Sequence, residues 1–261
     1  MTRALAAAFA AALLAGCASL EQPRADLAPS GKLRAAINLG NPVLASRGPG
    51  GELQGVSVDL ARELAQRLGV PAELLPFESA GKTVEAGRAG LWDIAFVALD
   101  PARGAEIAQS PPYVIIEGAY LVRESSPIRS NAEVDRPGNR VVVGRNSAYD
   151  LFLTRNLKQA QLERVPTSGE VVDAFLQRSL EVAAGVKQQL EMDAKRNSGV
   201  RLLPGRFMVI NQAMASQRGK EAGARFVREF IEDAKASGFV ARSLERHRIQ
   251  GAAVAPPGDA R

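Results

Sequence analysis

The chain has 261 residues, of which 33 are Lys or Arg and 28 are Asp or Glu, so its formal net charge at pH 7 is +5. This length suffices for one large domain or for two lobes. Basic residues are scattered among acidic ones without a block of like charge, which argues against a nucleic-acid-binding surface.

The first residues have the pattern of an export signal. Arg3 supplies a short basic region, and the apolar run ALAAAFAAALL at residues 4–14 is too short to span a bilayer, which takes about 20 residues. No later hydrophobic stretch is long enough to do so. We therefore expect a signal peptide at residues 1–16.

The one cysteine of the chain lies three positions after this apolar run. The segment Leu14-Ala15-Gly16-Cys17 resembles the lipobox of bacterial lipoproteins, in which the cysteine becomes the acylated first residue of the mature chain. We expect a lipidated tether or linker at residues 17–30, and a protein anchored through Cys17 in the periplasm or at the cell surface. An ordinary secretory signal that contains a cysteine is the alternative. The sequence does not decide whether the anchor lies in the inner or the outer membrane.

From Gly31 onwards, strand-like apolar runs alternate with helical patterns, which is typical of an α/β sheet with crossover helices. Strands are expected at LRAAINL (33–39), AELLPF (72–77) and WDIAFVAL (92–99), with a short helix around Val84. A longer helix precedes Gly69-Val70-Pro71, because apolar residues recur on one of its faces. These residues are Leu60, Ala61, Leu64, Ala65 and Leu68.

The second half of the chain repeats the alternation. Strands are expected at RVVVG (140–144) and EVAAGV (181–186). Ser147 with Asp150, and Thr167 with Glu170, have the spacing of a capping box that begins a helix. A final helix is indicated by Phe226, Val227, Phe230, Ile231 and Ala234. The last residues, 251–261, are expected to form a flexible tail.

Two stretches carry a resemblance to a known family. The first is GELQG at residues 51–55 with Asp59-Leu60-Ala61, and the second runs from Asp93 through Arg103 to Tyr113. Over roughly residues 31–248 the chain resembles the family 3 solute-binding proteins, the extracytoplasmic receptors of polar amino-acid ABC importers. The resemblance implies the two-lobed, type II periplasmic-binding-protein fold. In that fold each lobe is an α/β sheet flanked by helices, two crossing strands form the hinge, and the ligand lies between the lobes.

The resemblance also implies how the chain is divided. The first lobe would take residues 31–120 and the second lobe residues 121–204. Residues 205–250 would then return to the first lobe.

The segment Asp100-Pro101-Ala102-Arg103 is the strongest candidate for a binding site. Asp as N-cap and Pro at the first helical position make a good helix start. A carboxylate there would meet free backbone N–H groups and a guanidinium that can bind it through two hydrogen bonds. The resemblance implies that Arg103 binds the ligand carboxylate, with an arginine solvated in a first helical turn as the alternative. Asp100 is the nearest candidate to receive a ligand ammonium, unless it only caps the helix or pairs with Arg103.

Across the expected cleft, Asn146 and Ser147 occupy the place where family members usually carry Gly followed by Thr or Ser. Ser147 would cap its own helix and also donate a hydrogen bond to the ligand carboxylate. A plain N-cap is the alternative.

Three positions depart from the family pattern. Val186 stands where relatives usually offer an acidic residue to the substrate ammonium, so either the ligand lacks an α-amine or another group receives it. Asn41 aligns with a ligand-stacking aromatic residue of many relatives, and Asn38 with a nearby Asp. Both changes make this wall polar and neutral, which disfavours cationic substrates.

A few further residues have open roles. Glu117, Tyr120 and Gln212 lie on the expected crossing strands, where they would either face the ligand or hold the hinge together. His247 lies in a basic terminal helix, and we expect no chemical role for it.

The resemblance implies a substrate-binding component of an ABC importer that captures an amino acid or a related small carboxylate. Its expected partner is a permease in the inner membrane, without cofactor, metal or nucleic acid, and the protein is expected to be a monomer. A periplasmic enzyme similar to cyclohexadienyl dehydratases is the second possibility, with Asp100 or Glu117 as the acid that such chemistry needs. A ligand sensor that is not coupled to transport is the third.

Overall fold

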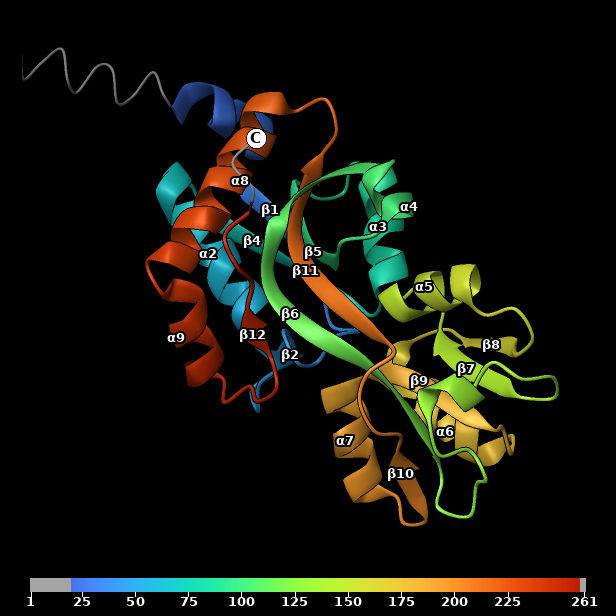
Figure 1. The fold of residues 1–261 in the computed structure, drawn as a ribbon. Helices are drawn as coiled ribbons and strands as arrows, with labels where there is room; N and C mark the ends of the chain where they lie inside the picture. Colours follow the sequence, from blue (N-terminus) through green and yellow to red (C-terminus); the bar gives the residue numbers. More distant parts are fainter. Residues whose placement is uncertain (1–19, 259–261) are drawn as a thin grey trace, which may run out of the picture.

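Two lobes are joined by two long strands, β6 (Ile107–Arg123) and β11 (Met208–Gln217), which cross from one lobe to the other (Figure 1). The structure is a computed structural model that describes residues 20–258. The expected signal peptide at 1–16 and the expected lipidation site Cys17 lie outside the described residues. Within residues 20–258, no helix combines the length and the apolar character that a membrane span requires.

The first lobe is built from both ends of the described chain. Before the first crossing it contains β1 (Leu33–Asn38), β2 (Ser46–Arg47), β3 (Leu53–Gln54), α2 (Val56–Leu68), β4 (Ala72–Phe77), α3 (Ala80–Arg88), β5 (Ile94–Ala98) and α4 (Pro101–Gly104). After the second crossing it gains α8 (Glu221–Ala236), α9 (Phe239–Arg246) and β12 (Ala253–Val254). Strand β1 runs parallel to both β4 and β5, as expected for strands joined by crossover helices.

The second lobe lies between the two crossings. It contains a 3₁₀ turn (Asn131–Glu133), β7 (Arg140–Gly144), α5 (Ala148–Asn156), β8 (Gln161–Val165), a second 3₁₀ turn (Ser168–Glu170), α6 (Val171–Gln177), β9 (Val182–Val186), α7 (Lys187–Arg196) and β10 (Val200–Leu202). Strand β7 runs parallel to β8 and β9, so this lobe repeats the α/β plan of the first.

The hinge strands belong to both lobes at once. Hydrogen bonds connect the strands in the order β4-β1-β5-β11-β6-β9-β7-β8, and β10 and β12 also pair with β6. Strand β6 therefore pairs with β11 along most of its length and with β9 near its end. The expected α/β fold with two lobes and two crossing strands is confirmed.

The predicted helix and strand patterns agree closely with the structure. The five apolar residues on one face of α2 are all buried, and Gly69 ends the helix in the left-handed conformation with a φ of 65°. The strands expected at 72–77 and 140–144 match β4 and β7. One capping prediction is wrong. The hydroxyl of Thr167 donates to the Glu170 carboxylate and does not cap the backbone, and a 3₁₀ turn precedes α6.

Both ends of the described chain pack against the first lobe, which differs from the expected linker and tail. Residues 20–27 are helical, and Leu27 is buried because its apolar side chain packs into the main core. Asp26 accepts a hydrogen bond from the backbone of Gly223 in α8 at 2.9 Å. At the other end, β12 pairs with β6, and the N–H of Gly258 bonds Glu232 of α8 at 3.2 Å. The expected linker and tail are thus ordered in these parts.

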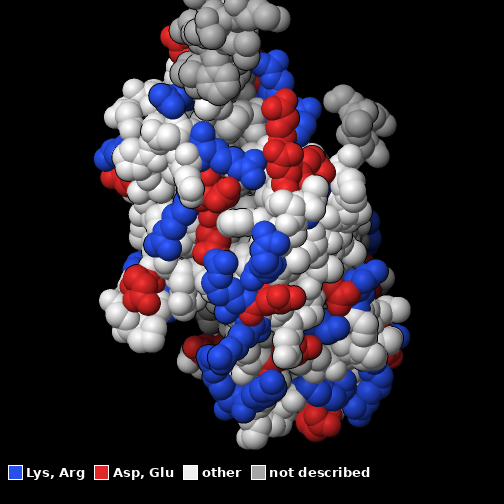
Figure 2. Space-filling view, turned by 90° about the vertical axis from the view of Figure 1, so that its left-hand side faces the viewer, with Lys and Arg blue, Asp and Glu red and all other residues white. Residues whose placement is uncertain are grey.

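Charges on the surface are mixed in sign. On the face that Figure 2 shows, Lys and Arg lie among Asp and Glu over the upper part of the molecule, and basic residues are more numerous towards its lower end. Exposed pairs of opposite charge, such as Arg88 with Glu106, contribute to this mixture.

Candidate functional site

A small cavity lies between the lobes, where strand ends and helix starts from both sides meet. The first lobe contributes residues after β1 and around α4, the second lobe contributes the start of α5 and the end of β9, and β11 contributes from the hinge. Its volume is about 30 Å³, which is room for about two water molecules. The polar residues that line it are Asn38, Asn41, Arg103, Ser147, Tyr149, Ser168 and Gln212. As it stands in this structure, the cavity is therefore too small for an organic solute.

Arg103 lies in the short helix α4 and is the one charged residue among those that line this cavity. Its side chain is buried, and it donates hydrogen bonds to two backbone carbonyls, Ala98 O at 3.0 Å and Asn146 O at 2.8 Å. Burial lowers the pKa of Arg103 to about 10, partly opposed by the nearby carboxylate of Asp100. The guanidinium is still charged at neutral pH, and it has no ion-pair partner among residues 20–258.

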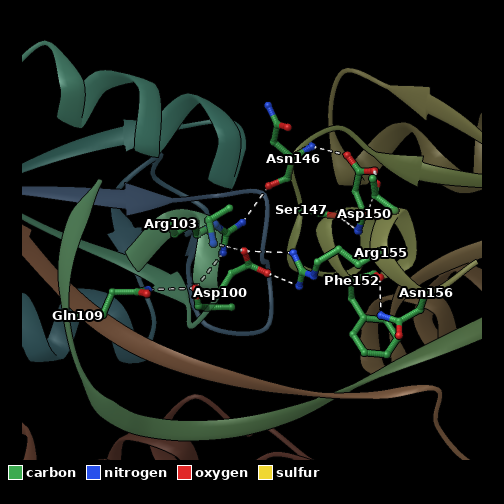
Figure 3. A network of polar contacts seen from close by, with 12 residues as sticks. Asp100, Arg103, Gln109, Asn146, Ser147, Asp150, Phe152, Arg155 and Asn156 are labelled. Carbon is green, nitrogen blue, oxygen red and sulfur yellow. Dashed lines mark hydrogen bonds and ion pairs between the residues drawn. The ribbon is translucent and has the colours of Figure 1, made fainter. Parts of the chain in front are cut away.

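Asp100 does not line the cavity. One of its oxygens accepts from the N–H of Ala102 at 2.9 Å, as predicted for an N-cap. The other accepts from Arg155 of α5 at 2.7 Å, which is an ion pair between the lobes (Figure 3). The structure thus favours the capping interpretation of Asp100 over contact with a ligand, because both oxygens already have partners.

Asn146 and Ser147 point in different directions. Asn146 has a φ of 56°, and its N–H donates to Asp150 at 2.7 Å while its carbonyl accepts from Arg103. The side chain of Asn146 therefore turns away from Arg103, and only its backbone meets the guanidinium (Figure 3). Ser147 lines the cavity and accepts from the N–H of Asp150 at 3.0 Å, so it caps α5 as predicted.

The lobes also approach each other next to the hydrogen bond between Arg103 and Asn146. A Cβ on Gly81 of α3 would lie 2.8 Å from the Cβ of Asn146, closer than side-chain carbons normally approach. A glycine at this position therefore lets the backbone of the first lobe come up to the second lobe.

The wall that the first lobe forms at the end of β1 is polar and neutral, as expected. Asn38 and Asn41 are both buried there. The side-chain oxygen of Asn38 accepts from the N–H of Gly40 at 3.0 Å. The side-chain oxygen of Asn41 is buried, and no described residue donates a hydrogen bond to it. Gln212 reaches the cavity from β11, next to a bulge in its pairing with β6.

The remaining candidates lie elsewhere. Glu117 forms ion pairs with Lys187 at 3.1 Å and Arg206 at 2.6 Å, and these contacts lower its pKa. Tyr120 stacks on Phe207 with ring centroids 4.2 Å apart. Both residues therefore have hinge roles in the structure.

His247 bonds the carboxylate of Asp59 at 3.0 Å. It lies at the rim of a larger groove of about 310 Å³ between α7 and the end of α9. Across residues 20–258, His, Cys, Asp and Glu form no cluster that is suited to a metal ion.

Two polar residues of the cavity, and the partner of Asp100, were not predicted. Tyr149 and Ser168 line the second-lobe wall, and the Tyr149 hydroxyl donates to Ser168 at 2.8 Å. Tyr149 lies two residues after Ser147 in a predicted helix start, so its position near the cleft could have been predicted from the sequence. The pairing of Arg155 with Asp100 joins residues 55 positions apart, and no local pattern indicates it.

Comparison with known proteins gives a consistent result. The sequence pattern of the bacterial extracellular solute-binding proteins, family 3, matches residues 33–249. No match was found among curated proteins.

Several solved structures share the fold. The L-cysteine solute receptor of Neisseria gonorrhoeae is 22% identical with a TM-score of 0.75, and the match covers 85% of this chain and 93% of that one. A binding component of an ABC transporter from Wolinella succinogenes, complexed with lysine, is 21% identical with a TM-score of 0.71, covering 83% and 95%. An ancestral amino-acid-binding protein, a precursor of cyclohexadienyl dehydratase, is 19% identical with a TM-score of 0.71, covering 84% and 95%.

Proposed function

We propose that this chain, which belongs to the bacterial extracellular solute-binding proteins of family 3, is the substrate-binding component of an ABC importer and captures a small solute with a carboxylate group between its lobes. The observation that carries this proposal is the buried guanidinium of Arg103 in the interlobe cavity. The solved structures with the same fold include receptors for amino acids, which are such solutes.

Arg103 has the chemistry to hold a carboxylate. An arginine has five N–H donors, and in this structure two hydrogen bonds to backbone carbonyls use part of them. Its buried positive charge has no carboxylate partner in residues 20–258, and an anionic ligand would supply one. Ser147, at the start of α5 across the cavity, would add a hydroxyl donor and the positive end of a helix dipole. Both groups therefore favour a negatively charged ligand.

Binding can be tested by thermal-shift screening of the purified protein against amino acids and other organic acids. A ligand at one hundred times its dissociation constant adds ~2.7 kcal/mol to the free energy of unfolding. We expect at least one small carboxylate to raise the melting temperature and neutral sugars to leave it unchanged. A response to sugars alone would show that the ligand class is wrong.

The role of Arg103 can be tested by calorimetry with the carboxylate that binds most tightly. Arg103→Ala should weaken binding by about 2–5 kcal/mol, because the ligand charge loses its partner in a buried site. Arg103→Lys should also fail to bind well, since an ammonium cannot reproduce the two parallel hydrogen bonds. Arg88→Ala is the control, because Arg88 pairs with Glu106 on the surface of the same lobe. Equal affinity of the Arg103→Ala protein would place the binding site elsewhere.

We further propose that Cys17 is acylated and tethers the protein to a membrane. The apolar run and the Leu-Ala-Gly-Cys segment before the folded lobes support this proposal. Metabolic labelling with a fatty acid should mark the wild-type protein and leave the Cys17→Ser protein unmarked. Equal labelling of the two proteins would contradict it.

A binding role is favoured over dehydratase-like catalysis, because both candidate acids form ion pairs outside the cavity. Asp100 caps α4 and pairs with Arg155, while Glu117 pairs with Lys187 and Arg206. Neither lines the central cavity, whereas a general acid must reach the reacting group. Turnover of prephenate by the purified protein would reverse this preference.

Loss of ligand uptake in cells that lack the protein would distinguish an importer receptor from a sensor.

A further inference from the structure

The central cavity of the cleft carries a single formal charge, which is positive. Of the thirteen described residues that line it, Arg103 is the ionised one, and none is Asp or Glu. One carboxylate of a ligand would balance this charge. A ligand that carried an ammonium as well would bring a second positive charge into a cavity without an anion to receive it.

Two acidic side chains close in sequence to cavity-lining residues are already paired with other cations. Asp100 pairs with Arg155 at 2.7 Å and also caps its own helix. Asp150, behind Ser147, pairs with Arg164 at 2.9 Å and accepts the N–H of Asn146. Neither carboxylate is free to turn into the cavity without breaking a partly buried hydrogen bond, so neither replaces the missing anion.

The cavity does contain an unused neutral acceptor. Asn41 is 7% exposed, and its side-chain oxygen is buried with no hydrogen-bond donor among residues 20–258. A buried acceptor without a donor is unfavourable, because it has lost its bonds to water. Gln212 adds a second neutral amide to the lining, and the wall at the end of β9 is the apolar side chain of Val186. The cavity thus offers a neutral acceptor for one hydrogen-bond donor of the ligand.

We infer that the ligand is a small monocarboxylate whose second polar group is a neutral donor, such as the hydroxyl of a 2-hydroxy acid, rather than an amino acid zwitterion. This inference rests on the proposed function and narrows its ligand class. The carboxylate pairs with Arg103, and the hydroxyl donates to the side-chain oxygen of Asn41. An ammonium at the same place would be a buried cation without a counter-charge, which is strongly unfavourable.

The inference is tested with ligand pairs in which one member carries an ammonium and the other a hydroxyl at the same carbon. Calorimetry and thermal shift on the purified protein would compare glycine with glycolate, L-alanine with L-lactate, L-valine with L-2-hydroxyisovalerate and L-phenylalanine with L-phenyllactate. We expect the hydroxy acid to bind more tightly by a factor of about ten or more in the pair that fits the cavity best. Tighter binding of the amino acid would overturn the inference and leave the proposed function intact. No response to any member would count against the proposed function itself.

A change of one residue adds a second test. Asn41→Asp keeps the size of the side chain and replaces the neutral acceptor by an anion, and no side-chain hydrogen bond of Asn41 within residues 20–258 is lost. We expect the preference to shift towards the amino acid of each pair by a factor of about ten or more. Asn131→Asp is the matched control, because Asn131 also has a buried oxygen without a partner but lies outside the cleft. An unchanged preference in the Asn41→Asp protein would overturn the role of Asn41 as the acceptor.

Discussion

Gly81 lies where the two lobes meet, and we expect Gly81→Ala to weaken ligand binding while it leaves the fold intact. The new Cβ would lie 2.8 Å from the Cβ of Asn146 and 3.3 Å from its side-chain nitrogen. Carbon atoms in contact rest at about 3.5–4.0 Å, so the lobes must stay apart by roughly 1 Å at this point. Gly81 lies inside α3 and has an ordinary helical backbone, so alanine itself is compatible with the position.

The size of the effect follows from the neighbouring hydrogen bond. Arg103 reaches the carbonyl of Asn146 at 2.8 Å, and a further 1 Å would break this bond. A hydrogen bond to a charged group contributes about 1.5–3 kcal/mol, so the affinity of the closed form should fall by about ten- to a hundredfold. Alanine in a helix is also more stable than glycine by roughly 0.5–1 kcal/mol. The melting temperature without ligand should therefore fall by less than the loss of this hydrogen bond alone would predict.

Calorimetry would measure the affinity, and small-angle X-ray scattering would measure the radius of gyration with and without ligand. Gly169→Ala is the matched control in the second lobe, because a Cβ there meets just Thr167 Oγ1, at 3.9 Å. We expect wild-type affinity for this control. Wild-type affinity for Gly81→Ala as well would refute the idea that the lobes close onto Asn146 in the geometry described.

Three further expectations concern stability. Without ligand, Arg103→Met should change the melting temperature little, because removal of a buried cation without an ion pair in the described residues offsets the loss of its hydrogen bonds to Ala98 O and Asn146 O; a large decrease would show that Arg103 is structural. Trp92→Phe should cost at least about 1 kcal/mol in chemical denaturation, since the bond from its indole N–H to Thr83 O at 2.7 Å is lost and the fully buried side chain becomes smaller; no change would contradict this prediction. Ion pairs lower the pKa of Glu117 in the folded state, so its contribution to stability is present above the unfolded pKa of about 4.3 and is lost as the pH falls through the folded pKa. Glu117→Gln should flatten the melting profile below about pH 4.3, and an unchanged profile would show that these ion pairs do not stabilise the fold.

Much of the fold was predictable because it depends on local patterns. Leu60 and Leu64 mark the buried face of α2, and the Asp-Pro start at Asp100 indicates where α4 begins. The cleft was predictable where a residue lies at the end of a strand or within a few residues after it, because the carboxyl ends of parallel strands meet at one edge. Asn38, Asn41 and Ser147 reach the cavity for this reason.

The rest of the site depends on contacts between distant parts of the chain. The partner of Asp100 is Arg155, in the other lobe, and only the arrangement of the lobes brings the two together. Asn146 has a side chain of the right kind, but its left-handed backbone conformation turns that side chain away from Arg103. The packing of Leu27 against the main core likewise depends on a surface that forms only after α2 and α8 are in place.

The docking of both chain ends on the same lobe has a mechanical consequence. Residue 20 and residue 258 both leave from the first lobe, through contacts with α8 and the core around it. Any pull from a membrane anchor before residue 20, or from a protein fused after residue 258, therefore acts on the first lobe alone. The second lobe carries no such load, so in the proposed closing of the cleft the second lobe would be the part that moves.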